Sequence, residues 1–161
     1  MSYPFVKKPL QMEKNESGMI PVLSVSPVKQ DHTLLQGILN RRESKWVLNK
    51  RATLRSALTT LRQRRFPIVI CECDLLPGSW KAVLEQLSRD PVHPYLIVTS
   101  RLADDRLWAE ALNLGAYDVL AKPFDSQEVS RVVDSAWHHW RNTNFGGTGA
   151  VPEPLPAAAG M

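Results

Sequence analysis

Short apolar runs alternate with segments of helical periodicity through the middle of the chain. The apolar runs are 21–25, 46–49, 68–71, 95–99 and 119–121. Between them, apolar residues recur at helical spacing in 32–41, 52–65, 80–88 and 104–114, and in a last helix that begins at Asp125 or Ser126. Pro67 ends the second helix and Gly115 ends the fourth. Five successive strand–helix units require parallel strands joined by helices that cover both faces of a sheet.

This pattern predicts a three-layer α/β fold of the flavodoxin-like type, a (βα)5 sheet with strand order 2-1-3-4-5. Sites in such folds form where the strands end. The side chains at these ends are Ser26 and Pro27, then Glu72, Cys73 and Asp74, then Thr99 and Ser100, and then Lys122.

The 161 residues suffice for one domain, which we place at 19–142. Residues 1–18 are polar and lack periodicity, which predicts a flexible arm. Residues 143–161 are rich in Gly, Pro and Ala, which predicts a disordered tail.

Composition favours a globular intracellular domain, with 43% hydrophobic and 22% charged residues. No apolar stretch is long enough to cross a bilayer, and the N-terminus has no continuous apolar run before a small-residue cleavage site, so we expect no secretory signal. We therefore expect a cytoplasmic protein without membrane contact. Cys71 and Cys73 lie in an apolar strand with no further Cys or His pair at ligand spacing, so they are interpreted as reduced thiols rather than metal ligands.

The net charge of +4 is unevenly distributed. Between positions 41 and 65, Glu43 is the single acidic residue, whereas nine residues are basic: Arg41, Arg42, Lys45, Lys50, Arg51, Arg55, Arg62, Arg64 and Arg65. Such a stretch is either a solvated helix face or a surface for nucleic acid or an acidic partner.

Residues 113–124, NLGAYDVLAKPF, resemble the Gly-Ala turn, short strand and Lys-Pro-Phe of response-regulator receiver domains of the chemotaxis type. Thr99 matches the hydroxyl that the family places at the end of its fourth strand. The resemblance extends over about 19–141 and implies a cis peptide bond before Pro123. It also implies phosphoryl transfer to a carboxylate, with Lys122, Thr99 and Mg²⁺ offsetting the negative charge.

The family's two acidic residues after the first strand are replaced here by Ser26 and Pro27. Neither side chain carries a charge that would hold a hard dication, which argues against Mg²⁺ binding, and we expect no cofactor. Asp31 lies further along, where we expect it to cap the following helix.

Three residues compete for the phosphoacceptor position. Counting back from Pro77 gives Cys73, aligning Gly78 with the family's loop gives Glu72, and a shorter loop gives Asp74. We favour Glu72 because the strand then ends in phase and Ser79 and Trp80 open the next helix. A glutamate there is either a permanent stand-in for phosphate charge or a purely structural partner of Lys122.

The family's aromatic switch position is Val119 here, and we expect the nearby Tyr117 on the other side of the strand. Trp108, Trp137 and Trp140 could form a contact face on the last two helices, although core packing is an alternative for Trp137. In the family this face, with the fifth strand, commonly mediates dimers or output contacts.

These features favour a non-enzymatic, stand-alone receiver that lacks the acidic Mg²⁺-binding pair, is not phosphorylated in the usual way, and acts by contact with a protein, either a histidine kinase or a downstream regulator. The alternative is a nucleic-acid or acidic-partner regulator that uses the basic stretch, although no reader motif accompanies it. A flavodoxin-like enzyme is disfavoured because no glycine loop follows the first strand.

Overall fold

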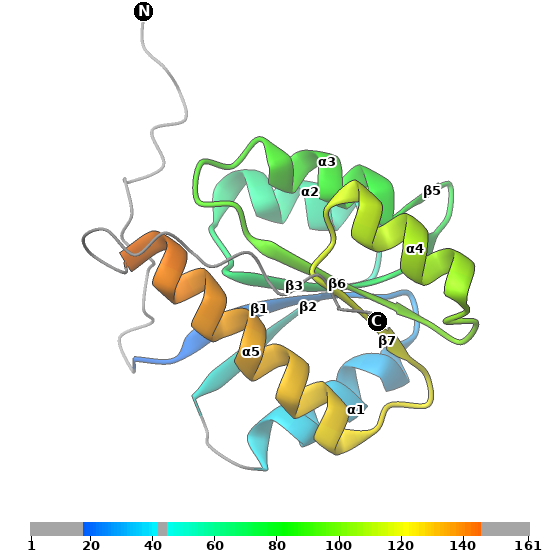
Figure 1. The fold of residues 1–161 in the computed structure, drawn as a ribbon, viewed down its shortest axis with the longest axis horizontal. Coiled ribbons are helices and arrows are strands. Elements are labelled where there is room, and N and C mark those ends of the chain that lie inside the picture. Colours follow the sequence, from blue (N-terminus) through cyan, green and yellow to red (C-terminus); the bar gives the residue numbers. More distant parts are fainter. Residues whose placement is uncertain (1–17, 42–44, 146–161) are drawn as a thin grey trace, which may run out of the picture.

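The chain folds around a five-stranded parallel sheet (Figure 1). The computed structural model describes residues 18–41 and 45–145. The strands are β1 (Ile20–Val25), β2 (Trp46–Arg51), β3 (Ile68–Glu72), β6 (Tyr95–Ser100) and β7 (Asp118–Ala121). Their order is β2-β1-β3-β6-β7, so the predicted order 2-1-3-4-5 is confirmed for the five major strands. The α/β flavodoxin-like architecture is confirmed with it.

A small second sheet follows β3 and was not predicted. Strands β4 (Asp74–Leu75) and β5 (Gly78–Ser79) pair antiparallel around the cis peptide bond between Leu76 and Pro77. This ribbon leads into the third helix, and it lies where the sequence predicted only a loop. A two-residue strand carries no periodicity, so the pattern of apolar residues could not reveal it.

The helices are α1 (Lys29–Asn40), α2 (Leu54–Gln63), α3 (Trp80–Ser88), α4 (Asp105–Leu114) and α5 (Ser126–Phe145). Most of them begin at a residue whose side chain caps the helix. Asp104 accepts a hydrogen bond from Leu107 N at the start of α4, and Gly115 ends that helix with a left-handed φ of 109°. Asp125 accepts from the backbone of α5. The predicted cap of α5 and stop of α4 are therefore both confirmed.

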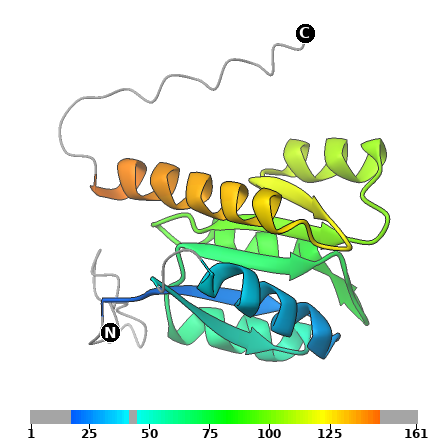
Figure 2. The same cartoon turned by 90° about the horizontal axis from the view of Figure 1, so that it is seen from below.

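The sheet separates two hydrophobic cores. One core lies beneath α1 and α5, and the other beneath α2, α3 and α4. Figure 1 shows the two helix layers on opposite sides of the sheet, and Figure 2 looks onto the side of α1 and α5. Every residue of β3 is buried, as expected for a central strand covered on both faces. The side chains of this strand therefore have access to solvent only near its ends.

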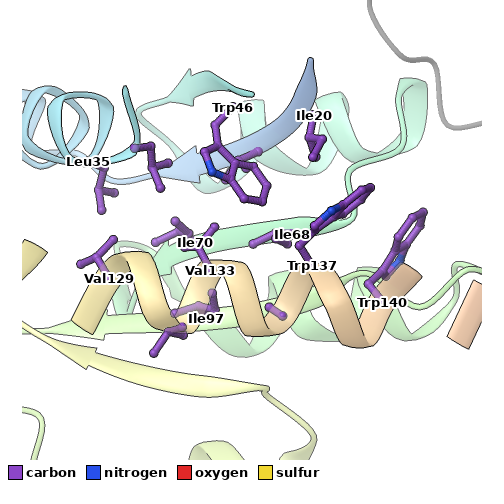
Figure 3. Packing of buried hydrophobic residues seen from close by; sticks show 14 of the residues in the cluster. Ile20, Leu35, Trp46, Ile68, Ile70, Ile97, Val129, Val133, Trp137 and Trp140 are labelled. Atoms are coloured by element: carbon purple, nitrogen blue, oxygen red, sulfur yellow. The ribbon is translucent and has the colours of Figure 1, made fainter. Parts of the chain in front are cut away.

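The predicted contact face of tryptophans is not present at the surface. Trp137 and Trp140 are 8% and 2% exposed, and both point from α5 into the core beneath it (Figure 3). Trp140 Nε1 also donates to the carbonyl of Val92 at 3.0 Å. Trp108 is half-buried against the other core. The contact face is wrong for Trp137 and Trp140, and the alternative of core packing is confirmed for Trp137, because α5 lays both tryptophans over the sheet near Trp46.

The predicted boundaries need one change within the described residues. Helix α5 continues to Phe145, so positions 143–145 are helical rather than part of the predicted tail. Almost all of the predicted arm and tail, at 1–17 and 146–161, lies outside the described residues. None of the helices in the described part of the chain combines the length and hydropathy needed to span a membrane.

Candidate functional site

The candidate residues lie together at the carboxyl ends of four parallel strands. Ser26 follows β1, Glu72 ends β3, Thr99 lies next to the end of β6, and Lys122 follows β7. Glu72 and Thr99 are direct partners in the parallel register of β3 and β6. Because all five strands are parallel, residues far apart in the sequence converge here.

Lys122 bridges two carboxylates in a buried ion-pair triad. Its Nζ atom lies 2.7 Å from Asp31 Oδ2 and also contacts Glu72 Oε2. The three side chains, Asp31, Glu72 and Lys122, are each 10% exposed or less. Burial alone would lower the pKa of Lys122, but the hydrogen bonds and charges of the two carboxylates outweigh it and raise this pKa above its ordinary value. Lys122 is therefore a permanent cation of the folded site.

A hydroxyl group supports each carboxylate of the triad. Thr99 Oγ1 donates to Glu72 Oε2 at 3.1 Å, and Ser26 Oγ donates to Asp31 Oδ2 at 2.6 Å. Ser26 Oγ in turn accepts from the backbone N–H of Val28 at 3.1 Å. The buried charges thus have the hydrogen-bond partners that a buried ion pair requires.

Asp31 corrects one prediction from the sequence. Helix α1 begins at Lys29, three residues before the predicted start, and Val28 occupies the N-cap without a side-chain bond. Asp31 consequently lies inside the first turn and points into the site instead of capping the helix. Asp31 on α1 therefore supplies a carboxylate to the pocket, although the sequence predicted it at the helix cap. An acidic residue in the first turn, close after Ser26, was the available signal.

The structure distinguishes the three candidates for the phosphoacceptor position by their orientation. Of the three side chains, only that of Glu72 bonds to the side chains of Lys122 and Thr99 within the described residues. Cys73 is half-buried and its Sγ donates to Glu72 Oε1 at 3.6 Å. Burial raises the pKa of the Cys73 thiol to about 11, so the thiol stays protonated and is a poor metal ligand or nucleophile. Asp74 is exposed on β4.

His32 lies directly behind the triad and was missed by sequence reasoning. Its Nε2 is 2.9 Å from the carbonyl of Ser26, and its Nδ1 is 2.8 Å from Ser24 Oγ. Since a carbonyl only accepts, Nε2 carries the proton and Nδ1 accepts from the Ser24 hydroxyl. Burial lowers the pKa of His32, which favours this neutral form. The ring fixes the backbone that carries Ser26.

The switch region agrees with the sequence prediction. Val119 is buried in the core beneath α2, α3 and α4, whereas Tyr117 packs on the side of α1 and α5. The Tyr117 hydroxyl is 2.6 Å from Ser135 Oγ and 2.8 Å from His139 Nδ1, both on α5. Its ring is therefore tied to α5, away from Thr99. The peptide bond before Pro123 is cis, as the resemblance implied.

The basic stretch is divided between exposed and anchored side chains. Arg41, Arg55 and Arg62 are exposed, and Arg51, Arg64 and Arg65 are half-buried. Arg42 lies outside the described residues. Lys45 pairs with Asp134 of α5 at 3.2 Å, so its charge is offset.

Comparison with known proteins places the chain in a family. A family model for the response regulator receiver domain matches residues 28–134. The transcriptional regulatory protein ZraR of Salmonella typhimurium is 29% identical over 147 residues, which cover 89% of this chain. The match covers 31% of that relative, so this chain spans about a third of its length.

Solved structures share the fold. The signal receiver domain of a putative LuxO repressor protein from Vibrio parahaemolyticus superposes with a TM-score of 0.74 at 16% identity, covering 81% of this chain and 99% of that one. The signal receiver domain of an HD domain-containing protein from Pseudomonas fluorescens gives a TM-score of 0.69 at 24% identity, covering 78% and 91%. The chain belongs to the response regulator receiver domain family of two-component signalling.

Proposed function

We propose that this chain is a receiver whose regulatory pocket is held by the ion-pair triad instead of by reversible phosphorylation. The observation that carries the proposal is the position of Lys122 Nζ, in contact with carboxylates from both α1 and β3. In the family, a lysine at this place offsets phosphoryl charge. In this chain, the carboxylates of Asp31 and Glu72 already pair with the lysine.

The donor set does not fit the Mg²⁺ that the family uses. Mg²⁺ prefers several oxygen ligands in octahedral geometry. Ser26 and Pro27 stand where the family has its acidic pair. Asp31 and Glu72 already accept from Lys122 and from hydroxyl groups. Asp74 lies within 4.8 Å of the ligand atoms of Glu72 and Cys73, but it is exposed. A dication between Asp31 and Glu72 would face the Lys122 ammonium, which favours a pocket without metal.

A glutamate at the end of β3 carries a fixed negative charge to the two groups that contact phosphate in the family. Glu72 reaches both Thr99 and Lys122. We therefore propose a single, constitutive signalling conformation, read by a protein partner such as a kinase or a downstream regulator in the cytoplasm. A shallow hollow of about 390 Å³, lined by Val28, Leu34 and Phe124 beside Asp31 and Lys122, offers such a partner access to the triad. Dimerisation through α4, β7 and α5 remains part of this proposal.

The direct test is intact mass spectrometry after incubation with Mg²⁺ and acetyl phosphate. We expect no adduct of ~80 Da on the parent protein or on a Glu72→Gln variant. A receiver domain with a complete acidic pair, treated alongside, confirms that the donor is active. A labile adduct on the parent protein at positions 72–74 would show that the proposal is wrong.

A gain-of-function variant sharpens the test. Combining Ser26→Asp, Pro27→Asp and Glu72→Asp restores the family's acidic pattern on the same fold. We expect this variant to take up the adduct at position 72 in the presence of Mg²⁺, and to lose it when Mg²⁺ is chelated. Matched circular dichroism spectra establish that the parent and the variant are equally folded.

A further inference from the structure

Basic and acidic residues are unevenly distributed along the chain, although Lys45 of the basic stretch pairs with Asp134 of α5. From 45 to 65 the sequence contains seven basic residues and no Asp or Glu. In contrast, α4, β7 and α5 carry the carboxylates Asp104 at the cap of α4, Asp105, Glu110, Asp118, Glu128 and Asp134. β2 and β7 form opposite edges of the sheet. The basic stretch is therefore gathered at the β2 edge and on the adjoining helix α2.

We use the name α2 basic surface for four arginines on and beside this helix: Arg51 at the end of β2, Arg55 and Arg62 on α2, and Arg64 at the C-cap of α2. Arg55 and Arg62 are exposed on α2 and seven positions apart, so they lie on one face of the helix. Their separation of about 10 Å along the helix axis matches about three phosphates of one nucleic-acid strand. Within the described part of the chain, no carboxylate forms an ion pair with any of the four.

The other two arginines are anchored by neutral groups. Arg51 donates from Nε to Thr60 Oγ1 and from Nη1 to the carbonyl of Lys50, both at 2.7 Å. Arg64 donates to Asn49 Oδ1 at 3.1 Å, and its guanidinium lies 5.2 Å from the ring centroid of Phe66. These contacts orient the guanidinium groups without cancelling their charge.

The charge at the N-terminus of α2 opposes the stability of this helix, whereas Arg62 in the last turn favours it. The first turn contains no acidic residue, and Arg55 stands there beside the positive end of the helix dipole. The capping box is completed by Ser56, where glutamate is a common choice. Residues that lower the stability of their own helix without improving its packing are expected at functional sites.

The surface suits phosphate better than a protein. The planar guanidinium group of arginine can donate two hydrogen bonds to one phosphate group. A protein partner usually needs an apolar or aromatic centre to its interface. Among residues 45–65, all of them described, no large hydrophobic side chain is exposed, and Trp46 is buried. We propose that the α2 basic surface binds the phosphate backbone of nucleic acid without reading its sequence.

Fluorescence anisotropy with a labelled duplex of arbitrary sequence tests this proposal, using the full chain. We expect micromolar affinity at low salt, and a slope of about −3 to −4 in a plot of log K against log salt, because each phosphate contact contributes about −0.9. Arg55→Gln combined with Arg62→Gln should reduce the size of that slope by about two. The control pair Arg106→Gln and Arg131→Gln removes the same charge from exposed positions on α4 and α5, and should leave the slope unchanged.

Each further outcome decides the question. Equal binding of DNA and RNA duplexes supports contact with the backbone. Absence of binding at about 50 mM salt overturns the proposal, as does equal weakening by both double variants. Competition by polyglutamate as effective as that by unlabelled duplex also overturns it, and assigns the surface to an acidic protein. Circular dichroism of all variants confirms that they are folded. The proposal does not rest on the phosphorylation state of the pocket.

Discussion

Removing the positive charge of the triad gives the sharpest test of the site. Lys122→Met keeps most of the side-chain length but leaves the carboxylates of Asp31 and Glu72 facing each other in a buried site. Taking away one partner of a buried ion pair costs about 3–5 kcal/mol. This loss is a large fraction of the stability of about 5–15 kcal/mol that is typical of a domain. We therefore expect a clear decrease in the free energy of unfolding.

The pH dependence of the loss identifies its cause. In the variant, the carboxylates of Asp31 and Glu72 face each other with no cation between them. The loss relative to the parent protein should be present at neutral pH. It should become smaller in the alkaline range, where the parent gives up the same stabilisation. In the parent, the raised pKa of Lys122 means that its stabilisation is fully present below the unfolded pKa and is lost only as pH rises through the folded pKa, in the alkaline range.

Urea unfolding followed by tryptophan fluorescence measures this loss, since Trp46, Trp137 and Trp140 are buried. Lys81→Met is the matched control. Lys81 pairs with Glu110 at 2.9 Å, but both side chains are well exposed, at 52% and 42%. Its removal should cost no more than about 1 kcal/mol. If Lys122→Met costs no more than Lys81→Met, or loses the same stability at neutral and at alkaline pH, the argument for a buried triad is wrong.

Four further substitutions test individual features of the structure. Gly115→Ala should destabilise the domain by about 1–2 kcal/mol, measured by urea unfolding, because φ is 109° at this helix end. Trp140→Phe should cost about 1–3 kcal/mol in the same assay, because the buried carbonyl of Val92 loses its donor. Arg55→Glu should raise stability by about 0.3–1 kcal/mol by reversing an unfavourable charge at the start of α2, and a lower urea midpoint would contradict this reasoning. Burial lowers the pKa of His32, so on acidification the unfolded chain binds a proton at a higher pH than the folded chain does. The free energy of unfolding should therefore fall as pH drops below about 6.5. This decrease should be smaller in His32→Gln.

Local patterns were sufficient to predict much of the fold and part of the site. The apolar runs gave the five major strands, and their alternation with helices gave the sheet order. Thr99 and Lys122 were found because Thr99 lies at the end of one apolar run and Lys122 directly follows another. Glu72 was favoured because the strand ends in phase there, and the structure directs its side chain to both of them.

The sequence by itself determined where the five major strands lie, to within two residues at each end, because strand periodicity and helix caps depend on neighbours a few positions away. Only the tertiary structure decided that Asp31 joins Lys122, a residue 91 positions later in the chain. Its direction depends on where α1 begins and how that helix packs against β2 and α5. Likewise, the burial of Trp137 and Trp140 depends on the path of α5 over the sheet. Contacts between distant segments come from packing, and no local pattern of residues encodes them.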